Sequence, residues 1–208
     1  MKIIKYFFEF IIIISLFSIF KIIGLKNASN LGSILVKIIG PYFRSKNIIK
    51  KNIKIGLGNI DEKKEEEIIN GMWSNIGSTF AEYVFLKDFK FNRTNYNHMK
   101  INGKNYLDEI KKNNQPVIFY SGHFANFELM AMELDKYGVK CAAMYRPLNN
   151  FFLNPLMEYL RMKYICPNQI PKGRMGMREI ISKIKNGYSV ALMVDQRVSE
   201  GPRVPFFN

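Results

Sequence analysis

The pattern of apolar residues changes near residue 115, and this change constrains the fold more than any other feature of the sequence. Beyond it, short apolar runs suited to buried strands occur at PVIFY (116–120), KCAAMY (140–145) and YSVALMV (188–194). Stretches with helical periodicity accompany them, around residues 127–136, 154–163 and 174–186. Continuous apolar runs that alternate with helices are typical of a sheet covered on both faces. The chain is therefore predicted to adopt an α/β fold in which helices flank a sheet.

The N-terminus is a segment of a different kind. Residues 6–20, YFFEFIIIISLFSIF, are apolar apart from Glu9 and two serines, and a count on to residue 25 gives twenty residues. About that many are needed to cross roughly 30 Å of hydrocarbon. Glu9 and Lys21 lie near the ends, where long side chains reach the interface. We interpret residues 1–25 as a membrane anchor helix, with a cleaved signal peptide and a buried core helix as the alternatives.

Positive charge is concentrated beside this segment. The formal net charge is +14, and residues 1–60 hold ten Lys or Arg against Glu9 alone, a net of +9. Basic residues next to an apolar segment favour anionic lipid headgroups, by about 1 kcal/mol each near the surface. Nucleic acid is the competing partner for such charge, and a merely basic solvated surface is the third interpretation. The positive-inside bias favours a cytoplasmic body for the protein.

The remainder of the chain divides into two parts. Residues 26–60 are interpreted as a basic membrane-proximal segment, with a helix broken at Gly40-Pro41. Residues 61–208 are interpreted as the α/β domain. Asp61 is suited to cap a helix running on to about residue 84, and we expect that helix to cover the sheet.

The two cysteines are expected to be unpaired. Cys141 and Cys166 are far apart in sequence and have apolar neighbours. Together with the small number of cysteines, this argues against a disulfide framework and for a reducing, cytoplasm-facing location.

The most informative local sequence is YSGHFANFELM, directly after the predicted strand 116–120. His123 would lie at the C-terminal end of that strand, where catalysts collect in open α/β sheets. Glu128 falls in the first turn of the next helix, where the helix dipole favours a carboxylate that can turn back toward His123. A carboxylate on one ring nitrogen leaves the other free as a general base. We predict that His123 and Glu128 form a catalytic pair; a histidine that only satisfies the strand end is the alternative.

Other chemistries have little support in the sequence. His98, in NYNHMKING, has no comparable strand-loop setting and is interpreted as a surface or turn residue. The spacings of His98, Cys141 and Cys166 match no usual zinc pattern, so no metal is expected. No phosphate-binding GxGxxG or GxxxxGK[ST] loop occurs, so nucleotide-dependent chemistry is not indicated.

Four motifs in a fixed order carry a resemblance to a known family. GHFANFE, YRPLNN, IPKGRMGMREIISKIKNGYSVALMVDQR and GPRVPFF are together similar to the lipid A lauroyl and myristoyl acyltransferases, over about residues 70–208. The resemblance implies a glycerolipid acyltransferase-like α/β fold, with a mixed sheet flanked by helices and an N-terminal membrane-anchor helix. The family continues beyond the pair that matches Phe206 and Phe207, so we expect the C-terminal part of the fold to lie outside this chain.

The resemblance also assigns site residues. The His-x4-acid dyad of the family falls on the pair predicted above, its tyrosine-arginine-proline motif includes Arg146, and its glycine-x-x-arginine motif ends at Arg178. Its aspartate-glutamine pair falls on Asp195 and Gln196. The forked donors of arginine suit phosphate, although either arginine could instead be a surface residue or pair with an acidic neighbour. Asp195 could bind one of these arginines, and Asn126 could open a helix whose backbone N–H groups face substrate.

The implied activity is O-acyl transfer. A fatty acyl chain would move from an acyl thioester, on acyl carrier protein or coenzyme A, to a hydroxyl of an anionic phosphoglycolipid such as a lipid A precursor. The enzyme would work at the bacterial inner membrane with its catalytic domain facing the cytoplasm, without cofactor, metal or nucleic acid. The alternative is a membrane-tethered basic protein that binds anionic lipid or nucleic acid without catalysis.

Overall fold

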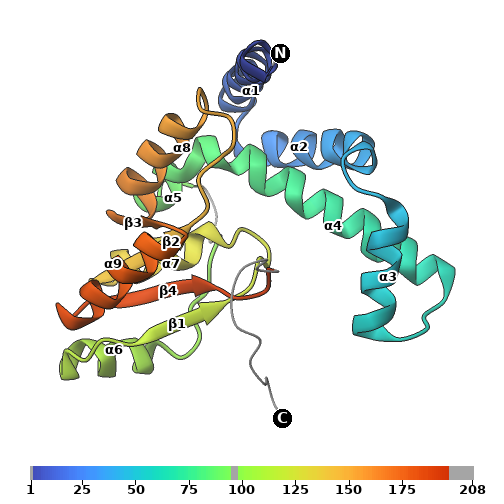
Figure 1. The fold of residues 1–208 in the computed structure, drawn as a ribbon. Helices are drawn as coiled ribbons and strands as arrows, with labels where there is room; N and C mark the ends of the chain where they lie inside the picture. The colour runs from blue at the N-terminus through green and yellow to red at the C-terminus, as the bar shows by residue number, and fades with distance from the viewer. Residues whose placement is uncertain (1, 95–97, 197–208) are drawn as a thin grey trace.

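A computed structural model describes residues 2–94 and 98–196, and at its centre lies a sheet of four strands (Figure 1). The strands are β1 (Ile118–Ser121), β2 (Cys141–Tyr145), β3 (Asn168–Pro171) and β4 (Ser189–Met193), in the spatial order β1-β4-β2-β3. The three predicted strands are confirmed. The short polar sequence of β3, NQIP, carries no apolar run and was not predicted.

All strand pairings in the described residues are parallel, so the expectation of a mixed sheet was wrong. The cause is the connections, because each pair of successive strands is joined through at least one helix that returns the chain to the starting edge. As a consequence, the C-terminal ends of all four strands meet at one edge. Ser121 of β1 is level with Met193 of β4, so the loops that follow these two strands begin side by side.

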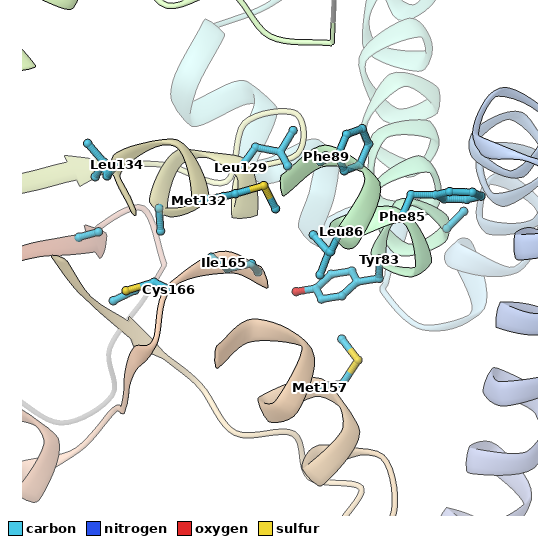
Figure 2. Close-up of a cluster of buried hydrophobic side chains, with 14 of the residues drawn as sticks. Tyr83, Phe85, Leu86, Phe89, Leu129, Met132, Leu134, Met157, Ile165 and Cys166 are labelled. Carbon is cyan, nitrogen blue, oxygen red and sulfur yellow. The ribbon is translucent and has the colours of Figure 1, made fainter. Parts of the chain in front are cut away.

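Helices flank the sheet, as predicted, although Ile118 and Tyr120 of the edge strand β1 remain exposed. On one face α9 (Arg174–Lys185) buries Ile180 against Ala142, Ile170 and Val190. On the other face lie α7 (Glu128–Lys136), α5 (Leu86–Lys90) and α8 (Asn154–Leu160), which continues into a π-helical turn at Arg161–Ile165. Figure 2 shows this second core, where Met132 of α7, Leu86 of α5 and Ile165 of the π-helical turn are almost fully buried. α6 (Lys104–Asn113) precedes β1.

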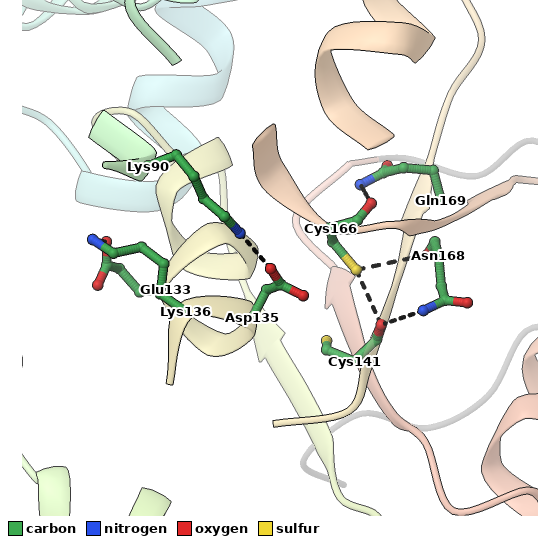
Figure 3. A network of polar contacts seen from close by, with 8 residues as sticks. All are labelled: Lys90, Glu133, Asp135, Lys136, Cys141, Cys166, Asn168 and Gln169. Atoms are coloured by element: carbon green, nitrogen blue, oxygen red, sulfur yellow. Dashed lines mark hydrogen bonds and ion pairs between the residues drawn. The ribbon is translucent and has the colours of Figure 1, made fainter. Parts of the chain in front are cut away.

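Polar contacts tie the second core to the sheet (Figure 3). An ion pair between Lys90 and Asp135 joins α5 to α7. Both cysteines are free, and the Cys166 thiol donates to the Cys141 carbonyl oxygen at 3.0 Å. Hydrogen bonding between the side chains of Cys141 and Cys166, together with burial, raises the pKa of the Cys141 thiol. This thiol is therefore protonated and unreactive, and its role is in packing.

The N-terminal half is a helical arm. It comprises α1 (Lys2–Ile23), α2 (Leu25–Ile39), a 3₁₀ turn (Gly40–Tyr42), α3 (Lys46–Leu57) and α4 (Glu62–Glu82). The predicted break at Gly40-Pro41 is confirmed. So is the cap of α4, because the Asp61 carboxylate accepts a hydrogen bond from the backbone N–H of Lys64 at 2.9 Å.

α4 was expected to cover the sheet, but its long contact is with α2 (Figure 1). The two helices cross at Gly32 and Gly77, where a Cβ added to Gly77 would lie 2.1 Å from the Gly32 carbonyl oxygen. Only glycine permits so close an approach. Ser33 and Ser74 then share a hydrogen bond of 2.7 Å across the interface. Backbone packing between the two helices thus fixes the direction of α4.

α1 is the one helix of the described residues that is long and apolar enough to cross a membrane, with a mean hydropathy of 2.2 over its best window. Most of its side chains are exposed, which argues against a buried core helix. Its C-terminal half nevertheless contributes Phe17 and Phe20 to the main core.

The N-terminal half of α1 contacts the loop after β2. The Asn150 amide donates to the Tyr6 carbonyl oxygen at 2.9 Å and to the Glu9 carboxylate at 3.2 Å. The rings of Phe151 and Phe152 lie edge-on to Tyr6 and Phe7, respectively, each at 5.7 Å between centroids. α1 is therefore joined to the α/β domain at both of its ends.

Candidate active site

His123 and Asp195 meet at the edge of the sheet. His123 follows β1 and Asp195 follows β4, and the pairing of these neighbouring strands brings both residues to the same level. The Asp195 carboxylate accepts from the backbone N–H of His123 at 2.6 Å and lies 2.7 Å from its ring Nδ1. Gly122 makes room for this contact, because a Cβ there would be 3.0 Å from the Asp195 carboxylate and 2.7 Å from the Phe124 ring.

This contact fixes the tautomer of the neutral imidazole. A carboxylate can only accept hydrogen bonds, so Nδ1 of His123 carries a proton, and in the neutral ring Nε2 then holds the lone pair. The Gln196 amide lies 3.3 Å from Nε2. Burial by itself would raise the pKa of Asp195, but the hydrogen bonds from the backbone and ring of His123 hold it below the usual value. The tautomer set by Asp195 thus leaves Nε2 of His123 as the nitrogen that can accept a proton, which is the arrangement of a general base.

The loop that carries His123 is held from α4. Ala125 has a φ of 45°, which is unusual for a residue other than glycine. Its carbonyl oxygen accepts from the Asn75 amide at 3.3 Å and from the Thr79 hydroxyl at 3.2 Å. The amide of Asn126 donates to Glu82 at 2.8 Å. Three polar residues on one side of α4, at spacings of four and three, thus position the loop, and this spacing was the signal that the sequence analysis missed.

Glu128 lies in the first turn of α7, as predicted, but it faces the core. Its carboxylate accepts from Nη2 of Arg161 at 2.7 Å, from Nε at 3.0 Å, and from the Tyr83 hydroxyl. Burial raises the pKa of Glu128, against the opposing charge and hydrogen bonds of Arg161. The Arg161 guanidinium also lies 5.6 Å from the centre of the Tyr145 ring. Sequence reasoning did not find Arg161, because nothing in RMKYI distinguishes a buried arginine from an exposed one.

The structure brings His123 together with Asp195 and Gln196, but not with Glu128. Among the described residues, the hydrogen bonds of the His123 side chain go to Asp195 and Gln196, and those of the Glu128 carboxylate go to Arg161 and Tyr83. The predicted pairing of His123 with Glu128 stays a prediction. The geometry instead gives Asp195 the place of the carboxylate on the imidazole.

The model of a protein family described as "Bacterial lipid A biosynthesis acyltransferase" matches residues 1–208 of the chain. The chain belongs to this family. Its members are O-acyltransferases of lipid A biosynthesis, so the resemblance carried by the four motifs is confirmed and extends over the whole chain. No curated protein matches the sequence.

The two arginines of the acyltransferase that were predicted to bind phosphate are exposed. Arg146 directly follows β2, and Arg178 lies in the second turn of α9. β4 separates β2 from β1, so Arg146 leaves the sheet about 10 Å from the strand that carries His123. Neither arginine has a hydrogen bond or ion pair with another described residue, so both are available to a ligand.

The remaining predicted residues of the acyltransferase are placed as follows. His98 packs its ring 4.7 Å from that of Phe89 and contacts Thr94, which fits a structural role. Within residues 2–94 and 98–196, no three His, Cys, Asp or Glu side chains gather as metal ligands would. Phe206 and Phe207, which match the last motif, lie outside the described residues.

Proposed function

We propose that the acyltransferase moves a fatty acyl chain from an acyl thioester to a hydroxyl of a lipid A precursor, with His123 as general base. The observation that carries this proposal is the hydrogen bond between Nδ1 of His123 and Asp195, since it makes Nε2 the proton-accepting nitrogen of the neutral ring. Nε2 takes the proton of the acceptor hydroxyl as its oxygen attacks the thioester carbonyl. The tetrahedral intermediate then expels the thiolate, which recovers the proton from the imidazolium.

Asp195 is proposed to orient the ring and stabilise the imidazolium. Asn126 and the start of α7 are proposed to stabilise the oxyanion through backbone N–H groups, and Gln196 to contact the substrate beside Nε2. Glu128 acts through the loop: its bonds to Arg161 and Tyr83 hold the beginning of α7, and with it the position of His123.

The substrates are proposed from charge. Arg146 and Arg178 are exposed, have no ion-pair partner among the described residues, and are suited to the phosphate of a phosphoglycolipid acceptor. Acyl carrier protein is the proposed donor partner, because an acidic carrier complements a chain of net charge +14. Residues 1–25 are proposed as the anchor in the inner membrane and residues 26–60 as the segment that lies against it, which places the domain from residue 61 on at the cytoplasmic face.

The function is tested by mass spectrometry of lipid A from cells that lack the full-length protein. We expect molecules that lack one secondary acyl chain, restored by the wild-type gene and not by a His123→Ala gene at equal protein level. Unchanged lipid A would contradict the proposed acceptor. Restoration by both genes would contradict catalysis by His123.

A further inference from the structure

The far end of the helical arm encloses a groove lined by none of the residues assigned above to acyl transfer. α3 lies beside the N-terminal part of α4 (Figure 1). Residues 41–57 and the first two-thirds of α4 line two adjoining hollows of about 260 and 460 Å³, which share Arg44, Ile49, Ile69 and Trp73. The larger hollow is of the size of ligand pockets in proteins. The groove lies away from the sheet, because α4 runs from it toward the His123 loop. Of its lining residues, Glu66 precedes Thr79 by thirteen residues, or about 20 Å of helix, and Ile76 precedes it by three.

The walls of the groove are apolar but open. Ile53 and Leu57 of α3 face Met72 and Ile76 of α4, and Leu57 and Ile76 are 60% and 45% exposed. The indole nitrogen of Trp73 is buried and has no hydrogen-bond partner in the described part of the chain. A contiguous apolar surface of this kind is unfavourable in water, and binding of a ligand or membrane would cover it.

The residues at the mouth of the groove indicate what covers it. Arg44 borders both hollows and has no ion-pair partner among the described residues. Lys46 also lines the mouth, in an exposed pair with Glu66 at 3.6 Å. Tyr42 and Phe43, directly before Arg44, are 89% and 81% exposed. Exposed aromatic residues beside a cation are typical of a membrane interface, where rings lie at headgroup depth and the cation meets phosphate.

We infer that this groove is a binding site for an anionic phospholipid of the bilayer, with one hydrocarbon chain between α3 and α4 and the headgroup phosphate at Arg44. The apolar walls fit the chain, and the unpaired guanidinium fits the phosphate. A soluble anion would not use the apolar length of the groove. A zwitterionic lipid would bring a second positive charge to the mouth beside Arg44 and Lys46, so the anionic lipid is preferred.

Trp73 reports binding directly, because it is the only tryptophan in the chain. The full chain is purified in a neutral detergent and titrated with phosphatidylglycerol that carries bromine on its acyl chains, and separately with phosphatidylcholine with the same chains. Bromine quenches indole fluorescence at contact. We expect saturable quenching, with the anionic lipid effective at about ten-fold lower mole fraction, the size of effect that one charge-assisted bond supplies.

Two variants separate the chain site from the headgroup site. Gly56→Leu places a side chain into the groove at a position where an added Cβ meets no atom within 4 Å, and it should abolish quenching by both lipids. Replacing this glycine within α3 also favours the helix, so folding is retained. Arg44→Gln should remove the preference for phosphatidylglycerol. The matched control is Lys51→Gln, which removes the same charge from an exposed position of α3 that does not line the groove.

The inference does not depend on acyl transfer, and its failure would leave the proposed function standing. Equal quenching by the two lipids, quenching that survives Gly56→Leu, or an equal loss of preference in Lys51→Gln would each overturn it. Displacement of the brominated lipid by a lipid A precursor more effectively than by unlabelled phosphatidylglycerol would also overturn it, because the groove would then belong to the acceptor.

Discussion

Two carboxylates lie close in space to the same loop, and they differ in almost every physical respect. Asp195 stands at the open edge of the sheet, its side chain 38% exposed, and binds the imidazole of His123. Glu128 is buried in the core and binds Arg161 and Tyr83. Hydrogen bonds lower the pKa of Asp195, whereas burial raises that of Glu128.

The difference in burial determines what each carboxylate can do. A solvent-exposed interaction between polar side chains contributes little to folding, because water competes for it, so the hydrogen bond of Asp195 to His123 is free to serve proton transfer. A buried ion pair that loses one member leaves an uncompensated charge in the core, so the interaction of Glu128 with Arg161 determines the local structure. Substitution of Asp195 should therefore mainly lower activity, whereas substitution of Glu128 or Arg161 should mainly lower stability.

The largest loss of activity is expected for His123→Ala. Removal of the base should reduce acyl transfer by roughly 10²- to 10⁴-fold, while the melting temperature stays close to that of the wild type. Assays of the full-length protein with labelled acyl carrier protein would measure this. His98→Ala is the control, since the only other histidine should leave the rate almost unchanged. Activity of His123→Ala within a few-fold of wild type would exclude His123 as the base.

The largest loss of stability is expected for Arg161→Met. This change leaves Glu128 buried without its charge partner, at a cost of about 3–5 kcal/mol in the free energy of unfolding. Folding already raises the pKa of Glu128, so its protonated form favours the folded state below the unfolded pKa of about 4.3 and this contribution is lost as the pH rises. The destabilisation should therefore be greater at pH 7 than at pH 5.

The double variant Arg161→Met with Glu128→Gln completes a cycle for this pair. Removal of the orphaned charge should restore part of the lost stability, measured by denaturant unfolding at pH 7. If the losses of the two single variants simply add, the buried pair is not the coupled unit that the geometry indicates.

The variants Asp195→Asn and Glu128→Gln test which of the two carboxylates orients the imidazole of His123. Asp195→Asn should lower kcat by about 10²-fold with little change in melting temperature, because an amide orients the imidazole less well and cannot stabilise its positive charge. The main effect of Glu128→Gln should be a lower melting temperature. The reverse result, a normal rate for Asp195→Asn and a selective loss of kcat for Glu128→Gln, would return the orienting role to Glu128, as the sequence spacing predicted.

The smallest effect concerns the arginines, which show the same contrast. Arg161 is buried and paired with Glu128, whereas Arg146 and Arg178 are exposed and have no ion pair with another described residue. Arg146→Met or Arg178→Met should raise KM for a phosphorylated acceptor by roughly ten- to hundred-fold and leave KM for the dephosphorylated analogue nearly unchanged. Kinetics with both acceptors at constant ionic strength would measure this. Equal losses on the two acceptors would identify these arginines as structural.

Sequence patterns predicted the elements of the fold better than their relations. Apolar runs identified β1, β2 and β4. Burial on both faces explains the runs of β2 and β4, whereas the edge strand β1 keeps Ile118 and Tyr120 exposed. β3 is short and polar and gives no such signal. The position of His123 after β1 was predictable because it depends on adjacent residues. Its partner Asp195 lies 72 residues away and depends on strand order, which periodicity does not encode. The direction of α4 depends on two glycines that touch across helices.

The contact between α1 and the loop after β2 has a geometric consequence for substrate choice. Asn150 ties this loop to the first turns of α1, and Arg146 leaves β2 only four residues earlier. With α1 in the bilayer as proposed, the strand ends cannot rise or sink independently of the anchor. The catalytic edge is then held at one depth relative to the headgroups, and hydroxyl groups at other depths are out of reach. The anchor helix would in this way measure distance along the membrane normal, and the acceptor would be selected by how deep its hydroxyl lies as well as by its charge.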